Sequence, residues 1–302
     1  MQRILIVEDS LVFTKMLKKK IESELEFQVE SVSTYSEAAR LISDKKSNFF
    51  IGLLDLNLPD APYGEIVDLV ISNGIPVIVF TGDFSDAVRE IFWSKKVVDY
   101  ILKEGRHNLD YLVSLIKRIY RNKSIKILVA EDSKIYRKHI CRLLKVHQYQ
   151  TLEANNGNEA IEILNMTPGI KLVITDYNMP EMDGFKLITK IRETYSKEDL
   201  AIIGMSASEK HDLSARFMKN GANDFIDKKF SSEEFYCRVS QNITMIEHIQ
   251  SIKDLSEKDY LTGLYNRRYF FESGRNIYSN GSSKRNLAKN VNNQWVTCNL
   301  GT

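Results

Sequence analysis

"ILIVEDS" at residues 4–10 and "ILVAEDS" at residues 127–133 are nearly the same heptapeptide, and together they decide the fold. Each is a short apolar run that ends in Glu-Asp-Ser. Continuous apolar runs of this length are typical of strands in a parallel sheet, because helices cover such a sheet on both faces. The repetition indicates that the chain contains two copies of one domain.

The same alternation of apolar runs and amphipathic stretches follows each heptapeptide. The first copy predicts strands at 3–8, 27–32, 50–54, 76–81 and 98–102, and the second at 126–131, 149–153, 171–175, 201–205 and 223–226. Strands that alternate with helices in this way form a doubly wound α/β domain. We therefore expect two such domains, at residues 1–122 and 125–245, and their connection is short and lacks Gly and Pro.

Composition narrows the class of protein. The 302 residues carry a net charge of +2, which gives no indication of nucleic-acid binding. Cys141, Cys237 and Cys298 are scattered, so we expect reduced cysteines and a cytoplasmic location. No apolar stretch approaches the roughly 20 residues that a membrane span requires.

A further helix begins near Ser231 and continues to about Leu255, which makes residues 246–258 a helical linker. Its apolar residues recur every three or four positions. Two interpretations stay open: an ordinary last helix with a frayed end, or a helix that leaves the domain and pairs with a second copy of the chain.

Polar residues follow the predicted strands at equivalent places in both copies. Ligands bind a doubly wound sheet at the carboxyl ends of its strands, so these residues form the candidate site. In the first copy they are Glu8, Asp9, Asp55, Thr81 and Lys103, and in the second copy Glu131, Asp132, Asp176, Ser206 and Lys228. The spacings agree, since 46 residues separate Asp9 from Asp55 and 44 separate Asp132 from Asp176, and each hydroxyl residue precedes its lysine by 22.

These groups suit one kind of chemistry. Three carboxylates at one edge would repel one another unless a cation lies among them, and Mg²⁺ favours oxygen ligands. An aspartate can attack phosphorus and form an aspartyl-phosphate, while a lysine and a hydroxyl bind the phosphoryl oxygens. The sequence has no Walker loop and no GxGxxG motif, so we expect a donor that carries the phosphoryl group ready to transfer.

Both copies resemble the receiver domains of two-component response regulators. The matching motifs are "IVEDS", "DLNLPD", "FTG" and "YILKE" in the first copy, and "VAEDS", "DYNMPEMDG", "MSAS" and "FIDKK" in the second. The resemblance implies a flavodoxin-like sheet of order 2-1-3-4-5 and a histidine kinase or histidine phosphotransfer protein as the donor. It also implies homodimerisation on activation.

The same resemblance implies a role for each motif residue. Asp55 and Asp176 would accept the phosphoryl group, and Glu8, Asp9, Glu131 and Asp132 would hold Mg²⁺ with them. The backbone carbonyls of Asn57 and Asn178 would complete the metal sites. Thr81 and Ser206 would sense the phosphoryl group, and Tyr100 and Phe225 would be the aromatic switches.

Two features depart from the family pattern. The proline that commonly follows the lysine is replaced by Glu104 and Lys229. Gly64 lies nine residues after Asp55, whereas Gly184 lies eight residues after Asp176. One extra residue beside the first site could therefore change partner choice.

Residues 259–272, "DYLTGLYNRRYFFE", resemble the opening motif of GGDEF domains, the diguanylate cyclases. The matching residues are Asp259, Leu261, Thr262, Gly263, Leu264, Asn266, Arg267 and Arg268. We interpret residues 259–302 as the truncated start of such a domain followed by a poorly ordered tail, because the tail is rich in Asn and has little periodicity. We therefore do not expect this chain to make cyclic di-GMP.

Three hypotheses of function remain. The leading one is a response regulator that accepts a phosphoryl group on Asp55, Asp176 or both, dependent on Mg²⁺. The second is a diguanylate cyclase that the receivers regulate, with its catalytic part absent from this chain. The third is a scaffold in which one receiver is only a dimerisation adaptor.

Overall fold

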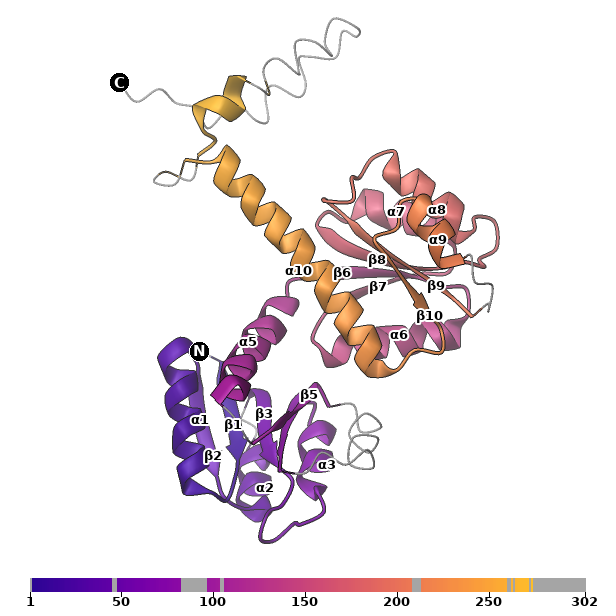
Figure 1. Cartoon of the computed structure of the whole chain (residues 1–302). Coiled ribbons are helices and arrows are strands. Elements are labelled where there is room, and N and C mark those ends of the chain that lie inside the picture. Colours follow the sequence, from indigo (N-terminus) through magenta and orange to yellow (C-terminus); the bar gives the residue numbers. More distant parts are fainter. Residues whose placement is uncertain are drawn as a thin grey trace, which may run out of the picture. The chain divides into compact units, whose positions relative to one another are not determined.

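The structure is a computed structural model that describes residues 2–44, 48–82, 97–103, 106–207, 213–259, 262, 264–271 and 273. The chain divides into two compact units, residues 1–243 and 244–302. The first unit holds two parallel sheets, each covered by helices (Figure 1). The domain limits predicted within it stay predictions.

Both sheets have five strands in the predicted order. The strands are β1 (Arg3–Val7), β2 (Gln28–Val32), β3 (Phe49–Asp55), β4 (Val77–Thr81) and β5 (Asp99–Leu102), then β6 (Lys126–Ala130), β7 (Gln150–Ala154), β8 (Ile170–Asp176), β9 (Ala201–Ser206) and β10 (Asp224–Asp227). They pair in parallel in the orders β2-β1-β3-β4-β5 and β7-β6-β8-β9-β10. The fold prediction is confirmed, and each strand limit differs from the predicted one by at most one residue.

Helices connect the strands, with labels that follow Figure 1, which has no α4. They are α1 (Leu11–Glu24), α2 (Tyr35–Ser43), α3 (Glu65–Ser72), α5 (Arg106–Asn122), α6 (Lys134–Val146), α7 (Gly157–Met166), α8 (Gly184–Arg192), α9 (Leu213–Lys219) and α10 (Ser232–Glu257). The serine of each Glu-Asp-Ser caps the helix that follows it. Ser10 Oγ accepts from Phe13 N and Ser133 Oγ accepts from Tyr136 N, both at 3.4 Å. These caps satisfy backbone donors that have no partner within the helix.

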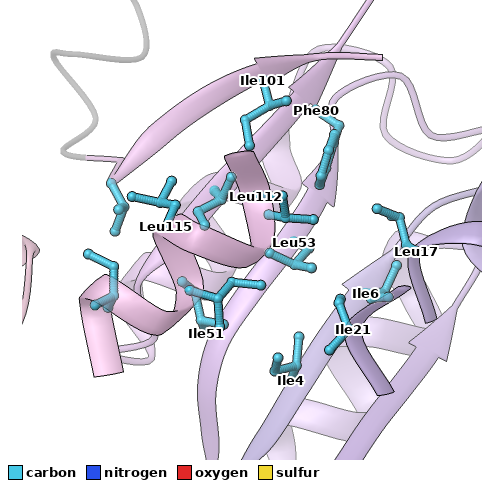
Figure 2. Packing of buried hydrophobic residues seen from close by; sticks show 14 of the residues in the cluster. Ile4, Ile6, Leu17, Ile21, Ile51, Leu53, Phe80, Ile101, Leu112 and Leu115 are labelled. Carbon is cyan, nitrogen blue, oxygen red and sulfur yellow. The ribbon is translucent and has the colours of Figure 1, made fainter. Parts of the chain in front are cut away.

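Successive side chains of β1 point to opposite faces of the sheet, and both faces are covered, so its whole apolar run is buried. Ile4 and Ile6 join the core that the strands form with α1 and α5, as Figure 2 shows. Leu5 and Val7 face the opposite side and join the core formed with α2 and α3. All four side chains are fully buried. A strand with apolar contacts on both faces is held in one register, which fixes where its last residue lies.

The second sheet packs in the same way. Leu128 and Ala130 of β6 belong to a core that includes residues of α7, α8 and α9. At Gly204 of β9 the ring of Phe217 lies so close that a Cβ would be 2.2 Å from its Cδ1. Glycine at this position therefore lets α9 approach the sheet.

The predicted long helix is confirmed as α10. Phe235, Val239 and Ile243 on it are buried, whereas Ile252 and Leu255 are exposed. The two interpretations of this helix therefore stay open. Among the residues that the structure describes, no helix is long and apolar enough to cross a membrane.

Candidate functional site

The predicted site residues of the first copy meet at the carboxyl edge of its sheet. Glu8 follows β1, Asp55 ends β3, Thr81 ends β4 and Lys103 follows β5. Glu8, Asp55 and Thr81 are buried, whereas the neighbouring Asp9 is exposed. The register of the strands brings these residues together, as the sequence predicts for a doubly wound sheet.

A lysine links the two buried carboxylates of the first copy. Lys103 Nζ lies 2.7 Å from Asp55 Oδ2 and 2.9 Å from Glu8 Oε2. The backbone N–H of Lys103 donates to Thr81 O at 3.0 Å, which ties the lysine to the end of β4. The ammonium thus lies where it could bind an oxygen of a group attached to Asp55.

The second copy repeats this arrangement with its own residues. Lys228 Nζ lies 2.7 Å from Glu131 Oε2 and 3.0 Å from Asp176 Oδ1. The backbone N–H of Lys228 donates to Ser206 O at 2.9 Å. The acidic pair, the central aspartate, the hydroxyl residue and the lysine therefore come together twice.

Burial sets the electrostatics of both sites. Desolvation raises the pKa of Glu8 and of Glu131, although their lysines and serine N–H groups act in the opposite direction. Desolvation also raises the pKa of Asp176. Burial alone would lower the pKa of Lys103, but its hydrogen bonds to Asp55 and Glu8 raise it overall. Each lysine therefore opposes a desolvation that disfavours the charged form of these carboxylates.

The carboxylates suit a divalent cation. Oxygens of Glu8, Asp9 and Asp55 lie within 4.8 Å of one another, and so do oxygens of Glu131, Asp132 and Asp176. Glu8 Oε2 and Glu131 Oε2 are buried and accept no aligned hydrogen bond, despite their ion pairs with the lysines. Three oxygen ligands with unused lone pairs are the donor set that Mg²⁺ prefers, so these residues fit the ion.

The predicted aromatic switches lie on the strands next to the lysines. Tyr100 of β5 is half-buried and packs against the core formed with α2 and α3. Phe225 of β10 is half-buried, with its ring centroid 5.3 Å from that of Phe217. Asn57 and Asn178 each follow the central aspartate by two residues, and Asn57 N donates to Asp55 Oδ1 at 3.3 Å.

The extra residue after Asp55 changes how the next helix begins. Gly64 N donates to Leu56 O, and Gly184 N donates to Tyr177 O, so each glycine closes the loop onto the residue after the aspartate. Gly64 is itself the cap of α3, with φ of +74°, whereas Asp183 caps α8. The added residue is thus accommodated by a left-handed glycine.

Sequence reasoning missed two residues beside the second site. Tyr136 donates its hydroxyl to Lys228 O at 2.9 Å. Arg137 is buried and donates through Nη1 to Glu131 O at 2.5 Å, and the matching residue of the first copy, Thr14, donates to Glu8 O at 3.4 Å. The signal for both was their position, three and four residues after the capping serine, where a helical side chain points back toward the strand end.

The GGDEF-like motif forms a tight turn within the second unit. Asp259 Oδ1 accepts from the N–H and the hydroxyl of Thr262, at 3.0 and 2.9 Å. Asp259 N donates to Leu264 O, and Asn266 N donates to Glu257 O, both at 2.7 Å. Arg267 and Arg268 lie in the short helical segment that follows. Leu261, Gly263, Cys298 and the tail beyond residue 273 lie outside the described residues.

Part of the chain is similar to a known protein family. The family model described as "Response regulator receiver domain" matches residues 127–240. The two-component response regulator ORR3 of Oryza sativa subsp. indica is 32% identical over 102 residues, which are 34% of this chain and 78% of that relative. ORR5 of Oryza sativa subsp. japonica is 31% identical over 102 residues, which are 34% of this chain and 76% of that relative.

Two solved structures match most of the chain. Both are of a two-component system response regulator/GGDEF domain protein, and both are 42% identical to this chain. The alignments cover 82% of this chain and 100% of each solved chain, with TM-scores of 0.71 and 0.70.

Proposed function

The chain belongs to the response regulator receiver family, and we propose that it accepts phosphoryl groups on Asp55 and Asp176. The observation that carries this proposal is the lysine that bonds the buried Glu and the central Asp in both copies. In both copies these groups meet at the carboxyl edge of the sheet, where doubly wound domains bind their ligands, which supports a shared reaction.

The proposed reaction is the transfer of a phosphoryl group from a phosphohistidine. An Oδ of Asp55 or Asp176 attacks phosphorus, a new O–P bond forms, and the P–N bond to the donor imidazole breaks. The electron pair of that bond stays on the imidazole nitrogen. A carboxylate nucleophile, unlike a hydroxyl, attacks without passing a proton to a base.

The other residues of each site bind the charge that collects on the phosphoryl oxygens. Lys103 and Lys228 would move from their carboxylates to one phosphoryl oxygen, and the hydroxyls of Thr81 and Ser206 would donate to another. Glu8, Asp9 and Asp55, or Glu131, Asp132 and Asp176, would hold Mg²⁺, with the carbonyl of Asn57 or Asn178. The ion supplies neutralising charge at the acceptor.

Phosphorylation would then shift the population of receiver conformations. If Thr81 or Ser206 turns toward the phosphoryl group, Tyr100 or Phe225 can turn inward behind it, which changes the surface around β5 or β10. We propose that this change controls homodimerisation and an output domain. The partner that supplies the phosphoryl group is a histidine kinase or a histidine phosphotransfer protein in the cytoplasm.

We also propose that the chain has a role in cyclic di-GMP signalling. It is supported by the two receiver/GGDEF structures that align with 82% of the chain, and by the turn at Asp259–Asn266. We propose that this turn opens a GGDEF domain. A test is to incubate the chain with GTP and Mg²⁺ and measure cyclic di-GMP. Product would support the cyclase hypothesis and contradict the expectation that this chain is inactive.

The central proposal is tested by labelling with a small phosphodonor such as acetyl phosphate. We expect labelling that requires Mg²⁺ and is lost in the Asp55→Asn/Asp176→Asn double variant. The Asp60→Asn variant is the matched control, because Asp60 lies five residues after Asp55 but binds the N–H groups of Tyr35 and Ser36 instead of Lys103. Undiminished labelling of the double variant would contradict the proposal.

A further inference from the structure

We propose that Tyr136 is a positioning residue of the second receiver, which holds Lys228 in place for phosphoryl transfer to Asp176. The inference rests on the proposed function and adds a residue that this function does not yet include. Tyr136 contacts Lys228 at both ends of that residue. Its hydroxyl donates to the backbone carbonyl of Lys228 at 2.9 Å, and the lysine Nζ lies over its ring, 4.6 Å from the centroid.

The start of α6 places Tyr136 against the site. Ser133 accepts from Tyr136 N, so the helix begins directly after the acidic pair Glu131 and Asp132. Tyr136 is the third residue after this cap and is half-buried. Because Ser133 N also donates to Glu131 Oε1 at 3.2 Å, one hydrogen-bonded turn links the tyrosine to the acidic pair.

The two contacts restrict Lys228 in complementary ways. The hydroxyl fixes the backbone where β10 ends, and the aromatic face attracts the ammonium. The ammonium then lies 3.0 Å from Asp176 Oδ1, and the exposed fraction of the Lys228 side chain is 14%. A long, flexible lysine normally loses conformational freedom when it binds, so a partner that restricts it beforehand favours the transition state.

The first receiver provides an internal comparison. Phe13 occupies the same place, three residues after the cap Ser10, and it has no hydroxyl. Lys103 Nζ lies 5.4 Å from the Phe13 centroid, and the exposed fraction of the Lys103 side chain is 26%. The Phe13 ring instead meets Phe80 edge-on at 5.4 Å. The lysine of the second site is therefore held more closely than that of the first.

The experiment measures labelling of Asp176 in the full chain with Asp55→Asn as the background. Acetyl phosphate and Mg²⁺ are varied, and the labelled fraction is followed by intact-protein mass spectrometry. We expect Tyr136→Phe to lower the maximal rate constant about three- to tenfold, the range for one lost hydrogen bond, with little change in the donor concentration that gives half the maximal rate. Tyr136→Leu also removes the ring, and we expect it to lower the rate further.

Two controls separate positioning from a general loss of structure. Tyr195→Phe removes a hydroxyl from another half-buried tyrosine of the same domain and should leave the rate unchanged. In the Lys228→Met background, Tyr136→Phe should change the rate less than about twofold, because the residue that it positions has lost its charge. If Tyr136→Phe lowers the labelling rate by the same factor with Lys228 and with Lys228→Met, the role of Tyr136 is merely structural and the inference is overturned.

The failure of the inference can be told from the failure of the proposed function. If the Asp55→Asn chain and the Asp176→Asn chain are both unlabelled, phosphoryl acceptance itself is wrong. If Asp176 is labelled and Tyr136→Phe labels at the parental rate, only the role of Tyr136 is wrong. Labelling of Asp55 in the Asp176→Asn chain should not respond to Tyr136→Phe.

Discussion

One lysine at each site lies between two buried carboxylates. Lys103 bonds Glu8 and Asp55, and both carboxylates are almost fully buried. Each negative charge alone would be costly in such surroundings, and the pair also repel each other. The ammonium therefore stabilises the folded state while no cation is bound, and it remains close to Asp55, the proposed phosphoryl acceptor.

We expect Lys103→Met to destabilise the protein by about 2 kcal/mol without Mg²⁺, because two buried carboxylates lose their positively charged partner. Methionine keeps the apolar stem, so the change tests the charge. Millimolar Mg²⁺ should restore part of the lost stability, since it binds only the folded site. Urea denaturation with and without Mg²⁺ measures both effects. Lys20→Met is the control, because it removes an ammonium that pairs with two exposed carboxylates, Glu24 and Asp110. Equal stability of Lys103→Met and its parent would refute the account.

A second prediction at the residue scale concerns the close approach of Gly184 to the backbone of Asp176. A Cβ at Gly184 would lie 2.3 Å from Asp176 O, so an alanine must displace the backbone of Asp176. We expect Gly184→Ala to cost about 2 kcal/mol or more in unfolding free energy and to abolish labelling of Asp176 but not of Asp55. Gly82→Ala, whose Cβ would meet nothing within 4 Å, is the control for stability. Normal labelling of Asp176 in Gly184→Ala would contradict the close approach.

At the scale of the elements, the apolar runs predicted all ten strands, because a strand buried on both faces leaves no room for polar residues. The ends of those strands then identified Glu8, Asp55, Lys103 and their counterparts. The role of Tyr136 could not be predicted in the same way. Its spacing from Ser133 places it on the first turn of α6, but whether its ring reaches Lys228 depends on how closely α6 packs beside the end of β10.

The cap of α3 shows a different limit of the sequence. The sequence shows the extra residue between Asp55 and Gly64, but it does not show how that residue changes the start of α3. Only the backbone reveals that Gly64 takes a φ of +74° and caps the helix, whereas Asp183 caps the matching helix in the second copy. Insertions in a loop change local torsions, which an apolar pattern does not record.

We expect the stability of the protein to depend on pH because of His147, the residue that follows α6. His147 is stacked on Tyr236 with 3.7 Å between centroids, and its ring hydrogen bonds to the backbone of Val98. Desolvation lowers the pKa of His147 from 6.5 to about 3. Below pH 6.5 the unfolded chain therefore binds a proton that the folded chain does not, so the unfolding free energy falls by up to about 1.4 kcal/mol per pH unit.

The measurement compares urea unfolding between about pH 7.5 and pH 4.5 in the parent and in His147→Phe. Phenylalanine keeps an aromatic ring beside Tyr236 but cannot be protonated, so we expect the acid-side slope to decrease by close to one proton. His248→Gln, a change at an exposed histidine on α10, is the control. An unchanged slope in His147→Phe would show that His147 is not held neutral by burial.

At the scale of the whole molecule, the chain carries two complete sets of site residues, and the sets differ in detail. The first has Phe13, a longer loop after Asp55 and a more exposed lysine, whereas the second has Tyr136, Arg137 and Asp183. Two sites that differ in this way can respond to one donor at different rates. We therefore expect the two proposed phosphorylation sites to fill at different rates.

The dimerisation proposal is tested by measuring mass in solution with beryllofluoride and Mg²⁺, which mimic an aspartyl-phosphate. We expect sedimentation equilibrium to show a shift from monomer toward dimer, because the mimic would favour the conformation with inward Tyr100 or Phe225. The Asp55→Asn/Asp176→Asn variant is the control and should not shift. An unchanged mass of the parent chain would remove phosphorylation-linked dimerisation from the account.

The most direct test of the central claim is to identify the phosphorylated residues themselves. The chain is labelled with acetyl phosphate and Mg²⁺, the acyl phosphate is reduced with borohydride, and the modified positions are mapped by peptide mass spectrometry. The account predicts modification at Asp55 and at Asp176, with the two sites filling at different rates. Modification at neither aspartate would contradict phosphoryl acceptance, and modification at only one would show that the other receiver is an adaptor.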